Sequence, residues 1–197
     1  IRMEASTNLI GGQPFSVQNL RDVRALADKY KIRLVLDCSL LGENAYLVLQ
    51  REPEFKDSNM ETVIKTMTGL ADLCYFSARK LSSSRGGGIC TDSMEIFKEL
   101  EAFIPLYEGF LTYGGMSIRE VEAMAVGLYE TLDETIISQS PTFIKYLVDS
   151  LDAKGIPMIK PAGVLGAHVD AMQLCAHIPQ TEYPAGALAA ALFLISG

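Results

Sequence analysis

Two short apolar runs, each ending in polar residues, most constrain what this chain can fold into. Ile32–Asp37 (IRLVLD) is almost continuously apolar and ends in a carboxylate, and Leu73–Ala78 (LCYFSA) ends with a serine at Ser77. Such runs are typical of strands buried on both faces of a parallel sheet. Helical periodicity in Ser16–Lys31 and Met60–Ala71 places a helix before each run. The alternation predicts an α/β fold with a mostly parallel sheet flanked by helices.

Further elements extend this pattern. Arg2–Thr7 is expected to be a strand, and Gly87–Cys90 is a third buried-strand candidate after the two runs above. Asp92, with Glu95 three residues later, is expected to cap the next helix. Ser117 and Glu120 form a capping-box pattern before a long helix predicted over Ile118–Ser138.

The C-terminal third of the chain has a different pattern of predicted helices and strands. Pro141 predicts a break, followed by a helix over Thr142–Ala153, and the segments IPMIKP and HVDA predict strands of another layer. We therefore divide the chain into residues 1–135, part of a large domain, and 136–197, part of a smaller α+β domain. Because it begins within a strand and stops in an apolar helical segment, we expect a fragment of a longer chain.

Composition excludes several classes of protein. The 197 residues are 49% hydrophobic with a net charge of −7, and no basic cluster exceeds two residues, which argues against nucleic-acid binding. No apolar run is long enough to span a membrane, and no signal peptide is visible. Four scattered cysteines without a CxxC pair predict reduced thiols in a cytoplasmic protein. Two histidines without further spaced ligands do not predict a metal site.

Polar side chains follow the predicted strands. Asp37 ends one run, Ser77 and Lys80 follow another, and Asn8 follows the N-terminal strand. The carboxyl ends of parallel strands lie at one edge of a sheet, where ligands bind. Pyridoxal phosphate requires an amine to bond its aldehyde, a carboxylate to face its ring nitrogen and hydroxyls to bind its phosphate. On these residues alone, Lys80 is either a reactive amine or a solvated turn residue.

A resemblance over nearly the whole chain bears on which of these two roles Lys80 has. The segments GGQPFSVQNLR, ENAY and YGGMSIREVEAMAVGL lie in order along nearly the whole chain. The chain resembles the tryptophanase and tyrosine phenol-lyase family of β-eliminating lyases. The resemblance implies the large domain of a fold-type-I pyridoxal-phosphate enzyme, an amino-acid substrate, and a homo-oligomer, dimer or tetramer.

The resemblance also implies site residues. Lys80 matches the Schiff-base lysine, and Asp37 matches the aspartate that faces the pyridine nitrogen. Asn8 matches the asparagine at the ring oxygen, Ser77 a phosphate-contacting serine, and Arg79 the basic residue beside the lysine. Tyr113 matches an active-site tyrosine.

The chain departs from the family at several positions. Leu40 stands where the family has an arginine, and Leu81 stands where an acidic residue usually follows the lysine. The shortened segment SSSRGGG places Arg85 near a position that looks like part of the potassium site, which leaves potassium activation in doubt. Leu165 aligns with a family histidine, so His168 is not expected to replace it.

The function implied is α,β-elimination of tryptophan or tyrosine to indole or phenol, pyruvate and ammonia. Lys80 is the expected base at the α-carbon, Asp37 holds the ring protonated, and Tyr113 is a candidate for proton transfer. Two alternatives stay open: another pyridoxal-phosphate reaction, such as an aldolase or aminotransferase reaction, and a non-catalytic remnant of the fold. Cys38 is either near the cofactor or a buried structural thiol, and Gly86–Gly88 either cradles phosphate or is an ordinary turn.

Overall fold

The computed structural model describes residues 1–110 and 114–197. Its single sheet has the order β1-β2-β3-β4, where β1 is Arg2–Glu4, β2 is Val35–Asp37, β3 is Leu73–Ser77 and β4 is Gly87–Cys90. The first three strands are parallel, and β4 pairs antiparallel with β3. The predicted α/β fold is confirmed, and each predicted strand of the sheet is present. The parallel register brings the carboxyl ends of β1, β2 and β3 to one edge.

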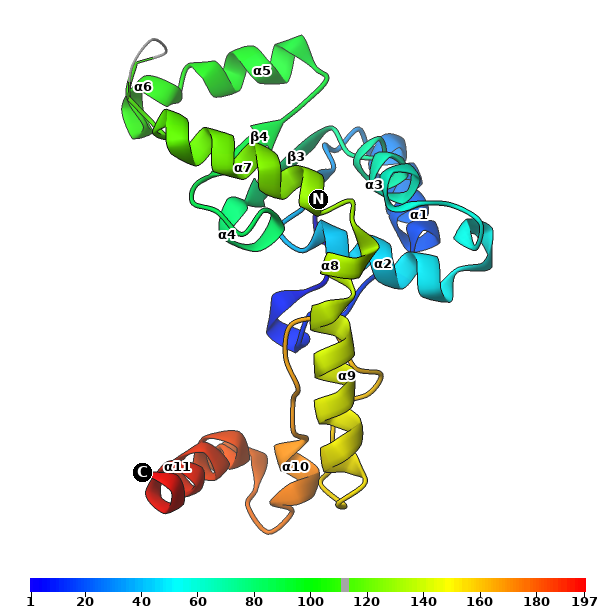
Figure 1. Ribbon diagram of the computed structural model, residues 1–197, viewed down its shortest axis with the longest axis vertical. Helices are drawn as coiled ribbons and strands as arrows, with labels where there is room; N and C mark the ends of the chain where they lie inside the picture. The colour runs from blue at the N-terminus through cyan, green and yellow to red at the C-terminus, as the bar shows by residue number, and fades with distance from the viewer. Residues whose placement is uncertain (111–113) are drawn as a thin grey trace.

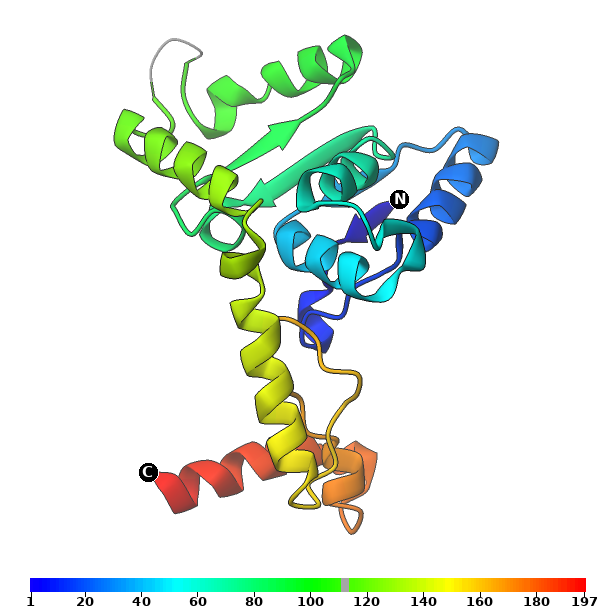
Figure 2. The same cartoon turned by 45° about the vertical axis from the view of Figure 1, so that its right-hand side comes forward.

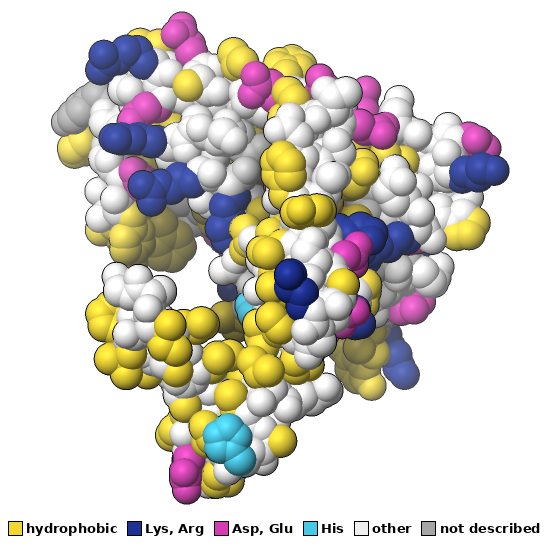
Figure 3. Space-filling view, turned by 60° about the horizontal axis from the view of Figure 1, so that its bottom comes forward, with side chains coloured by type: hydrophobic (Ala, Val, Ile, Leu, Met, Phe, Trp, Pro, Cys, Tyr) yellow, Lys and Arg dark blue, Asp and Glu magenta, His cyan; other side chains and the backbone are white. Residues whose placement is uncertain are grey.

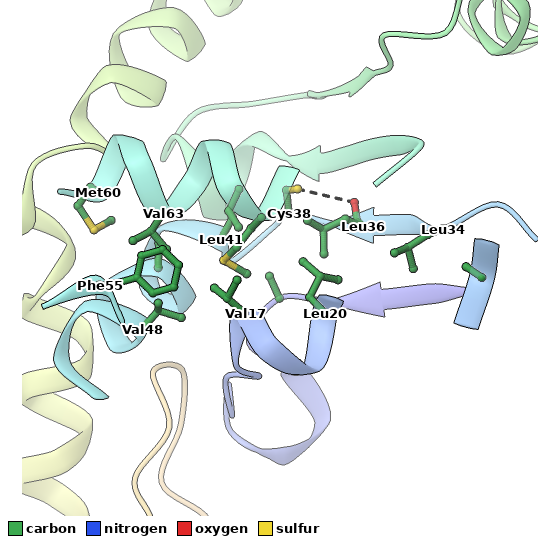
Figure 4. Close-up of a cluster of buried hydrophobic side chains, with 14 residues drawn as sticks. Val17, Leu20, Leu34, Leu36, Cys38, Leu41, Val48, Phe55, Met60 and Val63 are labelled. Atoms are coloured by element: carbon green, nitrogen blue, oxygen red, sulfur yellow. Dashed lines mark hydrogen bonds between the residues drawn. The ribbon is translucent and has the colours of Figure 1, made fainter. Parts of the chain in front are cut away.

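Three helices supply most of the core around the sheet: α1 (Val17–Tyr30), α2 (Leu41–Arg51) and α3 (Met60–Thr68). Ser16 caps α1 by accepting a hydrogen bond from the Asn19 amide. Figure 4 shows side chains of all three helices meeting those of the strand segment 34–38. The fully buried side chains among them include Leu20, Leu36, Met60 and Val63.

The sheet lies between two groups of helices. α1 and α3 lie together on one side, and α5 (Met94–Glu101) and α7 (Ile118–Glu130) lie on the other (Figures 1 and 2). Short helices η2 (Pro53–Phe55), α4 (Ala78–Leu81) and α6 (Ile104–Tyr107) connect these elements. The capping box of Ser117 and Glu120 is confirmed at the start of α7. The prediction that Asp92 caps α5 is wrong, because the Ser93 hydroxyl accepts the Ile96 amide there.

The predicted long helix over 118–138 is also wrong. α7 ends at Glu130, α8 spans Glu134–Ile137, and α9 spans Gln139–Asp152. The Thr131 hydroxyl donates to the Leu81 carbonyl, and the Asp133 carboxylate caps α8 by accepting the Thr135 amide. Pro141 lies within the first turn of α9, where a missing N–H costs nothing.

The C-terminal part extends away from the sheet along α9. α10 (Ala171–Leu174), η3 (Gln180–Glu182) and α11 (Pro184–Ser196) lie at its far end (Figures 1 and 2). The strands predicted in IPMIKP and HVDA are reduced to one antiparallel bridge between Met158 and Val169. The division at residue 135 stays a prediction.

Candidate active site

Asp37 is the last residue of β2, and two neighbours hold its carboxylate. The Ser39 amide donates to Oδ1 at 3.0 Å, and the Tyr75 hydroxyl donates to Oδ2 at 2.8 Å. Burial acts to raise the pKa of Asp37, but the hydrogen bonds from Ser39 and Tyr75 outweigh it and hold this pKa below its ordinary value. Arg2 donates in turn to the Tyr75 hydroxyl at 3.4 Å. The result is an oriented, ionised carboxylate at the strand end.

Ser39 links this carboxylate to the segment that carries the lysine. Its hydroxyl accepts the Ser77 amide at 3.1 Å, while its own amide donates to Asp37. Ser39 is 8% exposed, so the link is largely shielded from water. Asp37 and Ser77, predicted to be neighbours, are therefore joined through one buried serine.

Lys80 follows Ser77 in the short helix α4. The Ala78 amide donates to the Gly86 carbonyl at 3.0 Å, and the Ser82 hydroxyl donates to the Ala78 carbonyl at 3.0 Å. These bonds fold the chain back directly after the lysine. The side chains of Arg79 and Lys80 are exposed, and within residues 1–110 and 114–197 the Lys80 amine has no hydrogen bond or ion pair. Its amine is therefore uncommitted.

Asn8 opens the 3-10 helix η1 (Asn8–Ile10) beyond β1. Its amide donates to Glu4 Oε1 at 2.9 Å, and its side chain is exposed. Gly11 and Gly12 close this loop with positive φ values of 80° and 77°, a conformation that favours glycine.

The buried Asn44 of the ENAY motif anchors both ends of residues 6–15, which form the loop that carries Asn8 (the Asn8 loop). Its Oδ1 accepts the Ser6 amide at 3.1 Å and the Phe15 amide at 3.2 Å, and its Nδ2 donates to the Phe15 carbonyl at 3.0 Å. This asparagine was not predicted as part of the site, and neither were Ser39 and Tyr75. No sequence signal marks Tyr75, because the register that pairs it with Asp37 across β2 and β3 is set by the tertiary structure.

The positions that depart from the family lie in different settings. Leu40 is 4% exposed at the start of α2, and Leu81 packs against the core. Cys38 is 3% exposed and its thiol donates to the Leu36 carbonyl at 3.7 Å. This favours the interpretation of Cys38 as a buried structural thiol. Tyr113 lies outside the described residues.

His168, in the C-terminal part of the chain, lies against the Asn8 loop. A methyl group placed on Gly11 would lie 2.6 Å from its Nδ1, so the imidazole packs directly on the Asn8 loop. Within the described ranges, no three His, Cys, Asp or Glu side chains are grouped to hold a metal ion. A search of the same residues finds no helix able to cross a membrane.

Comparison with known proteins shows which family the chain belongs to. The family model described as beta-eliminating lyase matches residues 1–192. The chain belongs to the beta-eliminating lyase family. It is 36% identical to a tyrosine phenol-lyase of Pasteurella multocida over 100% of its own length and 43% of the relative's. It is 37% identical to a probable tryptophanase of Aeropyrum pernix, over 100% and 42% of the two chains.

Solved structures support the fold. A putative aromatic amino acid beta-eliminating lyase/threonine aldolase from Exiguobacterium superposes with a TM-score of 0.64 at 20% identity, over 85% of this chain and 43% of that one. A putative L-allo-threonine aldolase from Listeria monocytogenes gives a TM-score of 0.64 at 18% identity, with the same coverage. The predicted family and fold are confirmed. The chain spans less than half the length of the relatives that it matches.

Proposed function

We propose that the whole protein is a pyridoxal-phosphate-dependent lyase that eliminates the side chain of an aromatic amino acid, tryptophan or tyrosine. Membership of the beta-eliminating lyase family and relatives named tyrosine phenol-lyase and tryptophanase support this proposal. The observation that carries it is an ionised, hydrogen-bonded Asp37 joined through Ser39 to the segment of Lys80, whose amine is uncommitted.

The residues present fit the cofactor. The ionised Asp37 carboxylate would accept a hydrogen bond from a protonated pyridine nitrogen. The Ser39 amide and the Tyr75 hydroxyl already hold this carboxylate in one orientation. The Lys80 amine would hold the aldehyde carbon, and Ser77 and Arg79 would contact the phosphate. The exposed Asn8 side chain would bond the ring oxygen. When bound, pyridoxal phosphate supplies an electron sink for negative charge at the substrate α-carbon.

The chain's own residues would then move and hold protons. Lys80, once the substrate amine has displaced it, would remove the α-proton as a general base. Asp37 would keep the proton on the ring nitrogen by its negative charge, and Ser39 and Tyr75 would keep the carboxylate in place. Tyr113 remains the candidate for assisting proton transfer.

The test of this proposal is covalent labelling of the intact protein. We expect pyridoxal phosphate followed by borohydride to label the peptide that contains Lys80. Lys80→Ala should lose the label and at least about 10³-fold of pyruvate production, because it removes both the attachment and the base. Lys98→Ala removes an exposed lysine of α5 and should keep both. A label that survives Lys80→Ala would exclude this assignment.

A second candidate function is an aldolase reaction, favoured by the printed names of the two solved structures. Pyruvate from tryptophan or tyrosine supports the lyase, and glycine with an aldehyde from a β-hydroxy amino acid supports the aldolase. A protein that takes up no cofactor would be the non-catalytic remnant.

We also propose that the whole protein is a cytoplasmic homo-oligomer, a dimer or tetramer. Large apolar side chains exposed on α7 and α11, such as Ile118, Tyr129 and Phe193, support an interface. Light scattering of the intact protein would give its mass. Potassium activation stays a prediction, and assays in potassium and sodium salts would test it.

A further inference from the structure

The face of the sheet that carries Asp37 also carries two charged residues of β1. The parallel register pairs Glu4 with Asp37 and Asp37 with Tyr75, so these three residues form one row across β1, β2 and β3. Arg2 lies two residues before Glu4 and therefore on the same face. Leu36, which faces the opposite way, is fully buried in the hydrophobic core. The polar row thus lies on the side of the sheet away from this core.

The Arg2 guanidinium reaches both carboxylates of the row, one directly and one through a hydroxyl. Its Nη2 lies 3.8 Å from Glu4 Oε2. Its Nη1 donates to the Tyr75 hydroxyl at 3.4 Å, and that hydroxyl donates to Asp37 Oδ2 at 2.8 Å. The several N–H donors of a guanidinium allow both contacts at once. One positive charge is therefore shared between the carboxylates of two neighbouring strands.

The Glu4 carboxylate extends this network to the Asn8 loop. Its Oε1 accepts the Asn8 amide at 2.9 Å, while its Oε2 faces Arg2. The bond to the amide fixes the backbone from which the exposed Asn8 side chain projects. The Glu4 side chain is only 24% exposed, so it is shielded from most of the solvent. An unbroken series of contacts therefore joins the two residues expected to bind the cofactor ring: Asn8, Glu4, Arg2, Tyr75 and Asp37.

Electrostatic effects act along the same series. Burial disfavours the charged form of Asp37, the hydrogen bonds from Ser39 and Tyr75 favour it, and the positive charge of Arg2 lowers the pKa of Asp37 further. The Arg2 side chain is 63% exposed, so water and dissolved salt weaken its effect. The contribution of Arg2 is therefore moderate and depends on ionic strength.

We propose that Arg2 is a positioning residue of the cofactor site, whose charge holds Asp37 and Asn8 in the arrangement that binds the pyridine ring. It acts on Asp37 through Tyr75 and on Asn8 through Glu4. The inference rests on the proposed function, because both residues are expected ligands of pyridoxal phosphate. Since the link is ionic, part of the affinity for the cofactor should depend on salt through Arg2.

The test is titration of the intact protein with pyridoxal phosphate, followed by the absorbance of the bound cofactor at two ionic strengths. Arg2→Gln should raise the dissociation constant about two- to fivefold at low ionic strength, because it removes an exposed ionic contact. The difference from wild type should disappear in about 1 M salt, where exposed charges are screened. Arg2→Lys keeps the charge and should bring the constant to within about twofold of wild type.

Arg21→Gln is the matched control for this titration. Arg21 forms an ion pair with Glu54 at 2.6 Å, and neither residue contacts the network around Asp37. This variant should change the dissociation constant less than about twofold at either ionic strength. Equal losses of affinity in Arg2→Gln and Arg21→Gln, or a loss in Arg2→Gln that salt does not reduce, would overturn the proposal.

A second measurement uses the protein without cofactor and so does not depend on the proposed function. NMR titration of the Asp37 carboxylate should show a higher pKa in Arg2→Gln than in wild type, and no change in Arg21→Gln. An unchanged pKa in Arg2→Gln would overturn the proposal, and so would a raised pKa with wild-type cofactor affinity. If the wild-type protein takes up no cofactor, the proposed function fails, while this titration still decides whether Arg2 acts on Asp37.

Discussion

At the level of single residues, opposing influences act on the Asp37 carboxylate. Partial burial disfavours its charge, and hydrogen bonds from Ser39 and Tyr75 favour it. Burial raises the pKa of Tyr75, and the contact with Asp37 raises it further, because the neighbouring carboxylate resists a second negative charge. Tyr75 is therefore a positioning residue for Asp37.

Tyr75→Phe removes one donor without changing the size of the ring. We expect the pKa of Asp37 to rise toward its ordinary value and the free energy of unfolding at pH 7 to fall by about 0.5–1 kcal/mol. This is less than a fully buried charged hydrogen bond would contribute, because Asp37 is partly exposed. NMR titration of the carboxylate and urea unfolding would measure the two effects.

The pH dependence follows from the sign of the shift. Because the pKa of folded Asp37 is lowered, its contribution is complete above the unfolded pKa of about 3.9 and is lost as pH falls through the folded value. The stability difference between wild type and Tyr75→Phe should therefore vanish in strong acid. In an Asp37→Asn background it should be small at every pH, and a full-sized difference there would contradict the assignment.

At the level of elements, α2 holds the loop that carries Asn8. Asn44 is fully buried and satisfies the amides of Ser6 and Phe15. Asn44→Ala would leave two amides without their acceptor, so we expect a loss of about 2–4 kcal/mol in the free energy of unfolding and weaker cofactor binding. Asn59→Ala, which removes only the cap of α3, should cost about 1 kcal/mol and leave cofactor affinity unchanged. Equal effects of both variants on cofactor affinity would refute the role of Asn44.

The contact between α7 and the chain after Lys80 depends on a glycine. A methyl group on Gly127 would lie 1.9 Å from the Ser82 carbonyl oxygen, so α7 cannot stay in place with a larger residue there. We expect Gly127→Ala to lower the free energy of unfolding by about 2 kcal/mol or more, against the usual gain of alanine in a helix. Gly186→Ala in α11, where the nearest atom to the added methyl group would be 3.7 Å away, should be neutral or stabilising. Thermal unfolding of both variants would measure the two effects.

At the level of the whole molecule, residues 160–166 return from the far end of α9 to the Asn8 loop. The Val164 and Leu165 amides donate to the carbonyls of Gly12 and Gly11 at 3.1 and 3.0 Å. Gln13 Nε2 donates to the Pro161 carbonyl at 2.6 Å from the same loop. The loop that carries a proposed cofactor ligand is therefore supported by the C-terminal part of the chain.

Two glycines of this return segment allow a matched comparison. A methyl group on Gly163 would lie 2.2 Å from the Gly11 carbonyl oxygen, whereas one on Gly166 would meet only His168 Cε1 at 3.6 Å. Gly163→Ala should therefore cost about 2 kcal/mol or more and speed amide hydrogen exchange in residues 8–12. Gly166→Ala should change both measurements much less. Exchange in residues 8–12 that is unchanged by Gly163→Ala would exclude this coupling.

Apolar surface also has to be considered at this scale. Figure 3, in which the end with α10 and α11 comes forward, shows hydrophobic side chains across that part of the molecule. In α11, the exposed fraction rises from 59% at Leu192 to 85% at Ile195. Such a surface is unfavourable in water, which supports the proposed oligomer or contact with the remainder of the longer protein.

The sequence by itself determined the four strands of the sheet, the helices α1 and α3 and the family, because apolar periodicity and ordered motifs are local properties of the chain. It also placed Asp37 and Ser77 at strand ends and Lys80 just beyond one. Only the tertiary structure decided that β4 runs antiparallel and that Thr131 ends α7, because both depend on hydrogen bonds between distant segments. The roles of Ser39, Tyr75 and Asn44 likewise arise from hydrogen bonds between residues far apart in sequence, which no local pattern encodes.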